Sequence, residues 1–83
     1  MTNPNMETFM EEISRQLKLA KANGENSITL LSGNIHRAVG GYPQRNHRMR
    51  TCCDAMYAQT NKYEVIKPPK SGYGATLSIK YYL

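Results

Sequence analysis

The sequence lacks tryptophan and contains one phenylalanine and two cysteines. It also lacks an apolar run approaching the roughly 18 residues that would indicate a membrane-spanning helix. The opening "MTNPNMETFMEE" is acidic and holds no apolar stretch of the kind found in a secretory signal, so we expect a cytoplasmic protein with reduced thiols. At 83 residues, the chain is expected to form one domain, residues 1–83, with a modest core.

Acidic residues are scarce and unevenly placed. The chain has six acids against eleven lysines and arginines, a formal net charge of +5. No acid occurs between Ser27 and Cys53, whereas the first 25 residues hold four of the six. One-sided positive charge is typical of proteins that bind a polyanion, although a basic surface that only aids solubility has the same composition.

Motifs of enzymes and cofactor sites are missing as well. The sequence has neither a P-loop nor a dinucleotide-binding glycine pattern. Cys52 and Cys53 are adjacent, which does not fit the two-residue gap of a thioredoxin-like pair. A catalytic dyad of Cys53 and His36 is conceivable, but a buried thiol lacks the electropositive, exposed setting that activates it. We therefore predict that the chain is not an enzyme and uses no cofactor.

A zinc site is another alternative for the cysteines and histidines. Structural zinc sites usually place cysteines two to four residues apart, so that two thiolates converge on one ion. Adjacent cysteines on a helix diverge by about 100°. The sequence therefore predicts that Cys52 and Cys53 are unligated small core residues, at least one of them buried. The four candidate ligands are His36, His47, Cys52 and Cys53.

The first half of the sequence predicts a helix, a strand and a short helix. Between Pro4 and Gly24, apolar residues recur every three or four positions, which is typical of an amphipathic helix. The run "SITLL", residues 27–31, predicts a strand. Ser32 is then expected to cap a helix that ends at residues 40–41. The residues expected to face inward are Met6, Phe9, Met10, Ile13, Leu17 and Ala20 from the first helix, and Ile35, Ala38 and Val39 from the second.

The second half predicts a helix and a β-hairpin. Asn46 is a suitable cap for a helix that runs to about residue 60. Residues 63–67 predict a strand, a connection rich in proline and glycine follows, and alternation over residues 76–83 predicts a second strand. The apolar stripe expected on the helix is Met49, Cys52, Cys53, Met56 and Thr60.

This order of elements is that of a winged helix-turn-helix, an α+β fold, and it covers nearly the whole chain. The segments "SGNIHRAVGGYPQRNHRMRTCCDAM" and "GATLSIKYYL" also resemble a group of small bacterial and phage winged-helix proteins, mostly without assigned function. The resemblance implies a DNA-associated role, regulatory or linked to phage and defence systems, and implies no particular operator.

In such a fold, the recognition helix presents side chains to base edges in the major groove, where the arginine fork suits guanine. Here the recognition helix is predicted over residues 46–60 and the wing over residues 67–76. His36 and Arg37, on the preceding helix, are expected to reach the DNA backbone. Double-stranded DNA is the expected partner, with a homodimer as a possible state. The predicted nucleic-acid-binding residues are Arg37, Arg45, His47, Arg48, Arg50, Thr51, Lys67, Lys70 and Tyr73.

The alternative function is a winged-helix module for protein–protein interaction. A small basic domain with exposed tyrosines would suit an accessory or inhibitor that docks on an acidic protein or a nucleoprotein complex. The first helix and the C-terminal strand are the expected surfaces for self-association. The tyrosines expected to be exposed are Tyr42, Tyr57, Tyr73 and Tyr82.

Overall fold

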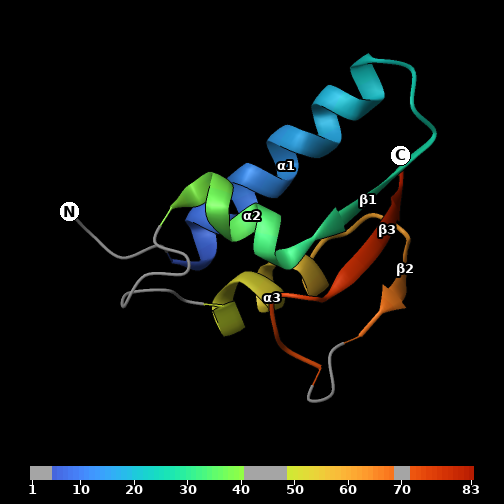
Figure 1. Ribbon diagram of the computed structural model, residues 1–83. Helices are drawn as coiled ribbons and strands as arrows, with labels where there is room; N and C mark the ends of the chain where they lie inside the picture. Colours follow the sequence, from blue (N-terminus) through green and yellow to red (C-terminus); the bar gives the residue numbers. More distant parts are fainter. Residues whose placement is uncertain (1–4, 41–48, 69–71) are drawn as a thin grey trace.

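The computed structural model describes residues 5–40, 49–68 and 72–83. Within these ranges the chain forms three helices and a three-stranded antiparallel sheet, so it is α+β, as predicted. The helices lie on one side of the sheet (Figure 1). The elements are α1 (Met6–Ala22), β1 (Ser27–Leu31), α2 (Ser32–Val39), α3 (Met49–Tyr57), β2 (Tyr63–Lys67) and β3 (Ser78–Tyr82).

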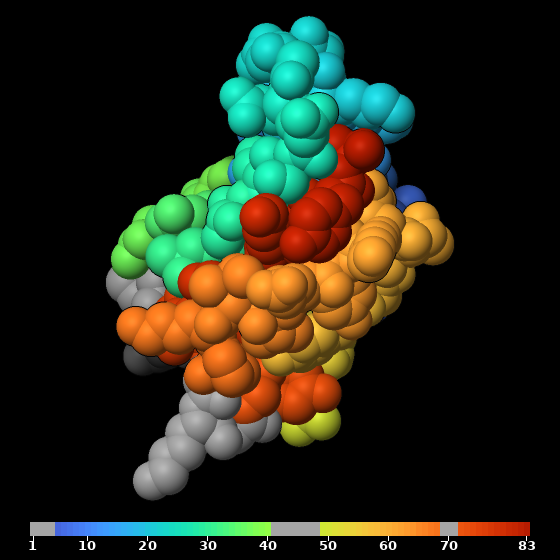
Figure 2. Space-filling view, turned by 90° about the vertical axis from the view of Figure 1, so that its right-hand side faces the viewer, coloured from blue at the N-terminus to red at the C-terminus, as the bar shows by residue number. Residues whose placement is uncertain are grey.

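The last strand, β3, is the centre of the sheet. It pairs antiparallel with β1 on one side and with β2 on the other. Figure 2 shows the outer face of the sheet, where the red β3 lies between the teal β1 and the orange β2. This face is open, and the inner face packs on the helices. None of the described helices is both long enough and apolar enough to cross a membrane.

Helix α1 has a capped start and a glycine after its end. The side chain of Asn5 accepts a hydrogen bond from the backbone N–H of Thr8 at 2.9 Å, which satisfies a free donor of the first turn. Glu7 in the first turn and Lys21 in the last turn both interact favourably with the helix dipole. Gly24 follows with a φ of 86°, a conformation that glycine adopts without strain.

The core lies between the helices and the inner face of the sheet. Tyr81 of β3 is fully buried, and its hydroxyl donates to the carbonyl of Met56 at 2.8 Å, so its polar end is satisfied. Burial raises the pKa of this hydroxyl. The core cluster is Phe9, Ile13, Leu17, Leu30, Ile35, Met49, Cys52, Cys53, Ala55, Met56, Leu77, Ile79 and Tyr81, with Met6, Met10 and Val39 partly buried against it.

Three predictions about α2 were wrong. Ser32 is the first helical residue rather than the cap, and its hydroxyl donates to the carbonyl of Gly74. His36, expected at the DNA-facing surface, is fully buried, whereas Ala38, expected inside, is exposed. The cause is the helical period, because Ser32 and His36 are four residues apart and share the inward face with Ile35, whereas Ala38 points away.

The ends of two later elements also differ from the prediction. Helix α3 ends at Tyr57, and Thr60 is exposed rather than part of the buried stripe. The chain has to leave the helix early because β2 begins at Tyr63, whose hydroxyl donates to the carbonyl of Tyr57 at 3.1 Å. Strand β3 covers Ser78–Tyr82 rather than residues 76–83. The predicted helix start at Asn46 lies outside the described residues.

Candidate nucleic-acid interface

The segment before β3 is attached to the start of α2 by backbone hydrogen bonds. The N–H of Ser32 donates to the carbonyl of Leu77 at 2.9 Å, and the N–H of Gly33 donates to the carbonyl of Ala75 at 3.1 Å. A Cβ atom at Gly33 would lie 3.1 Å from the carbonyl oxygen of Ala75, so glycine permits the close approach of the two backbones. Residues 75–77 are thereby fixed against α2.

The two cysteines of α3 hold the same segment from the other side. Both are fully buried, which confirms the predicted burial. The thiol of Cys53 donates to the carbonyl of Gly74 at 3.4 Å, and its sulfur accepts from the N–H of Gly74 at 3.3 Å. Cys52 donates to the carbonyl of Ser32 at 3.5 Å. The cysteines therefore connect α3 to α2 and to the connection between β2 and β3.

Burial also controls the chemistry of these thiols. Burial, reinforced by the neighbouring Cys53, raises the pKa of Cys52 to about 12, and burial raises the pKa of Cys53 as well. Both thiols are therefore protonated at neutral pH. Because the thiolate is the nucleophile and the metal ligand, this environment suits neither nucleophilic catalysis nor metal binding.

The two histidines considered in the zinc and dyad alternatives, His36 and His47, are placed differently. Among the described residues, no group of three or more His, Cys, Asp or Glu side chains could hold a metal ion. His47 lies outside those residues. His36 packs edge-on against Phe9 with ring centroids 4.8 Å apart, at the contact between α1 and α2. The position of His36 therefore indicates a core role.

Stability should fall at alkaline pH because of the buried thiols. The pKa of Cys52 rises from 9.0 to about 12 on folding, so the unfolded chain loses its thiol protons first and is favoured as the pH increases above about 9. Urea unfolding should show a lower midpoint at about pH 10 than at neutral pH. The variant Cys52→Ala should show a smaller decrease, and an identical decrease in variant and wild type would contradict this assignment.

A chain of aromatic and polar contacts joins the start of α3 to the same connection. Arg50 is exposed in the first turn of α3, and its guanidinium carbon lies 4.6 Å from the centroid of the Tyr73 ring. Tyr73 meets Tyr57 edge-on with centroids 6.0 Å apart. The hydroxyl of Tyr57 donates to the carbonyl of Gly72 at 2.7 Å. These contacts place a cationic side chain of α3 beside the β2–β3 connection.

The remaining predicted residues lie elsewhere on the described surface or outside the described ranges. Arg37 is exposed near the end of α2, and its Nη1 donates to Oδ1 of Asn34 at 3.2 Å. Thr51 is half-buried in α3, and Lys67 is exposed at the end of β2. Of the predicted residues that the structure describes, Arg50 and Tyr73 are in contact with each other. The predicted residues outside the described ranges are Arg45, His47, Arg48 and Lys70.

Sequence reasoning missed two features of the described surface, one beside α3 and one on the outer face of the sheet. Tyr57 and Tyr73 were expected to be exposed but are half-buried, because they pack on each other; Tyr42 lies outside the described residues. On the outer face of the sheet, the amino groups of Lys80 and Lys62 lie 5.3 Å and 6.0 Å from the ring centroid of Tyr82. Alternation along β3 could have indicated that Lys80 and Tyr82 share a face. The position of Lys62 could not be predicted in this way, because Lys62 comes from the turn before β2.

Removing the hydroxyl of Tyr57 should loosen the β2–β3 connection. Tyr57→Phe deletes the hydrogen bond to Gly72 and should lower the free energy of unfolding by about 0.5 to 1.5 kcal/mol. Tyr82→Phe is a matched control on the outer sheet face, where Tyr82 is 37% exposed, and should change stability by less than about 0.5 kcal/mol. Urea denaturation followed by circular dichroism measures both. Equal effects would show that the bond to Gly72 contributes nothing.

Comparisons of the chain with protein-family models, with curated proteins and with solved structures find no match. The function has to follow from the chain's own residues. Its described surface offers an exposed arginine held on a tyrosine, next to a connection that is bonded to both α2 and α3. Such a surface can present guanidinium and amine donors to an anionic partner.

Proposed function

We propose that the protein is a winged helix-turn-helix protein that binds double-stranded DNA. In this proposal α3, with the residues just before it, enters the major groove, and the β2–β3 connection is the wing that contacts the DNA backbone. The single observation that carries the proposal is the position of Arg50, exposed at the start of α3 and stacked on Tyr73 of that connection.

The arrangement of elements supports the proposal. The order α1, β1, α2, α3, β2, β3, with β1 and β2 both paired to β3, is the arrangement expected of a winged helix. Helix α3 turns its apolar stripe, including Met49, Cys52 and Met56, towards the core. Its exposed side therefore remains available, as a recognition helix requires.

The charge distribution also supports the proposal. The stretch from Ser27 to Cys53, which includes α2 and the start of α3, contains arginines and no acid. Arg37 and Lys67 are exposed at the ends of α2 and β2. An exposed arginine stacked on an aromatic ring keeps its N–H donors free at the edge of the guanidinium plane. Arg50 is therefore suited to contact a phosphate or the acceptor edge of a guanine.

A second candidate function, docking on an acidic protein or a nucleoprotein complex, is favoured by the outer face of the sheet. There Tyr82 is 37% exposed between Lys62 and Lys80, and Ile66 is 49% exposed at a bulge of β2. Aromatic residues with neighbouring cations are typical of interaction surfaces. The two candidates use different faces of the molecule, so substitutions can separate them.

Replacement of one arginine tests the DNA-binding proposal. Arg50→Ala should weaken binding to a labelled duplex, by about 1 to 3 kcal/mol if a preferred site exists. Arg15→Ala is the matched control, because Arg15 is 61% exposed on α1 and its loss changes the net charge equally. Fluorescence anisotropy at low salt measures both affinities. Equal weakening by the two variants, or weakening only when Lys62 and Lys80 are replaced, would contradict the proposal.

A further inference from the structure

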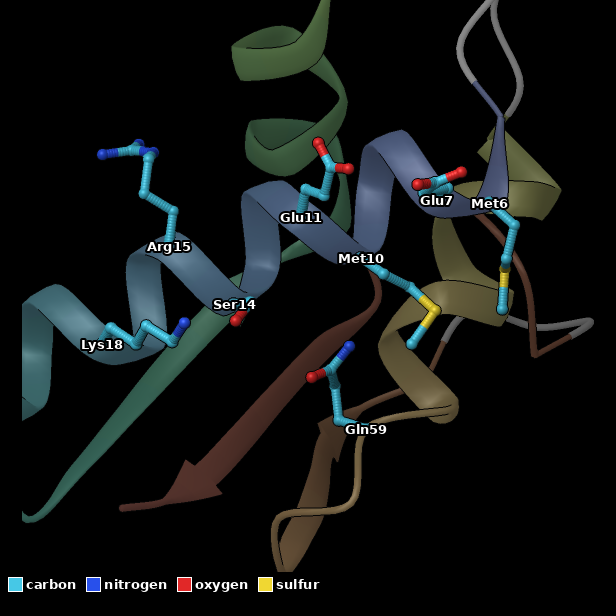
Figure 3. A pocket seen from close by; sticks show the side chains of 8 residues that line it. All are labelled: Met6, Glu7, Met10, Glu11, Ser14, Arg15, Lys18 and Gln59. Atoms are coloured by element: carbon cyan, nitrogen blue, oxygen red, sulfur yellow. The ribbon is translucent and has the colours of Figure 1, made fainter.

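Helix α1 has an open groove along the flank that lies beside the segment following α3, which includes Gln59. The groove has a volume of about 870 Å³ and is mainly apolar, because Met6 and Met10 line it. In Figure 3 both methionines point from α1 towards α3, and Gln59 lies beyond the end of that helix. A second depression continues it towards Lys21 and shares Ser14, Lys18 and Gln59 with the first. Together they form one surface along most of α1, called here the α1 groove.

The charges beside the α1 groove are divided between its two ends. Glu7 and Glu11 lie along the first half of α1, and Lys18 and Lys21 lie along the second half. Arg15 is already paired with Glu12 of its own helix, at 2.7 Å. Ser14, a small residue, lies between the acidic and the basic halves.

This distribution is self-complementary in one orientation. If two copies of α1 cross antiparallel near Ser14, a two-fold axis places Glu11 of each copy opposite Lys18 of the other, and Glu7 opposite Lys21. A parallel pairing would instead oppose acid to acid and base to base. An isologous interface requires a surface that fits itself in this way. Methionine adapts well to an apolar partner surface, and a small central residue allows close approach of the two helices.

We propose that the α1 groove is the interface of a two-fold homodimer in which the partner is the antiparallel α1 of a second copy. This inference does not depend on DNA binding. It adds that the proposed DNA-binding surface on α3 would occur twice in the assembly, related by the same two-fold axis. Operators read by such dimers are themselves palindromic, with half-sites about 34 Å apart.

Charge reversal across the two-fold axis tests the interface without DNA. Glu11→Lys places lysine opposite Lys18 of the partner, and Lys18→Glu places glutamate opposite Glu11, so each variant should dimerise about tenfold more weakly than wild type. In an equimolar mixture, however, every opposed pair is again of opposite charge, and the heterodimer should regain the wild-type affinity. Glu25→Lys, an exposed acid outside the α1 groove, is the matched control and should leave the dimer unchanged.

Sedimentation equilibrium over a range of protein concentrations measures all five samples (wild type, the two reversals, their mixture and the control), with circular dichroism to confirm folding. A concentration-dependent dimer, weakened by each single reversal and restored by mixing, is the expected result. A wild-type protein that stays monomeric up to its solubility limit would overturn the proposal. So would a dimer that is insensitive to both reversals, equally sensitive to Glu25→Lys, or not restored by mixing. Because no DNA is present, these outcomes are independent of the proposed function.

Discussion

Duplex DNA should bind the protein roughly 10²- to 10³-fold more weakly when the salt concentration is raised from about 50 to about 200 mM. The reason is counterion release. Six of the predicted contact residues are cationic, and neutralisation of about four to six phosphates gives a log–log slope near −4 to −5, since each contributes about −0.9. The six are Arg37, Arg45, Arg48, Arg50, Lys67 and Lys70.

Single substitutions should distinguish residues that contact phosphates from residues that contact bases. Lys67→Ala and Lys70→Ala, in the proposed wing, should weaken binding to all sequences alike and reduce the slope by about one each. Arg48→Ala and Arg50→Ala should in addition reduce the preference for any favoured site, because an arginine at a base edge carries sequence information. A slope near zero in the wild type would contradict phosphate binding altogether.

Phe9→Ala should lower the free energy of unfolding by about 3 to 5 kcal/mol, the largest effect expected of a single change in the fold. Phe9 is fully buried in α1 and meets the ring of His36 edge-on at 4.8 Å. Its loss removes apolar burial and leaves a cavity between α1 and α2. For a domain whose total stability is about 5 to 15 kcal/mol, such a loss is a large fraction.

The matched control for this prediction is Leu19→Ala on the same helix. Leu19 is 53% exposed, so its truncation should change stability by less than about 0.5 kcal/mol. Urea denaturation followed by circular dichroism measures both variants. Comparable losses in the two would show that the buried face of α1 has been assigned to the wrong residues.

Periodicity in the sequence was sufficient to predict most elements of the fold. Phe9, Ile13 and Leu17 recur at helical spacing and are buried as predicted, and Ile79 and Tyr81 alternate on the inner face of β3. Local pattern failed where a tertiary contact competes with it. Ser32 has the residue type of a cap, yet its hydroxyl bonds to Gly74, which is distant in the sequence.

The candidate site was predicted less completely, because its contacts join residues that are distant in the sequence. Charge identified Arg50 as a candidate, but its contact with Tyr73 joins α3 to a connection that follows β2. The half-buried state of Tyr57 likewise depends on residues of that connection, because its ring packs against Tyr73 and its hydroxyl donates to the carbonyl of Gly72. Neither contact has a periodic signature, because each is made only when the β2–β3 connection folds back on α3.

The most direct test of DNA binding is a titration of the ¹⁵N-labelled protein with a short duplex at low salt, followed by amide chemical-shift changes. The expected changes concentrate at Arg50 and Thr51 in the first turn of α3, and at Tyr73 and its neighbours in the β2–β3 connection. Changes confined to Lys62, Lys80 and Tyr82 on the outer sheet face would contradict the proposal and favour the docking alternative. An absence of any change at low salt would contradict binding to DNA itself.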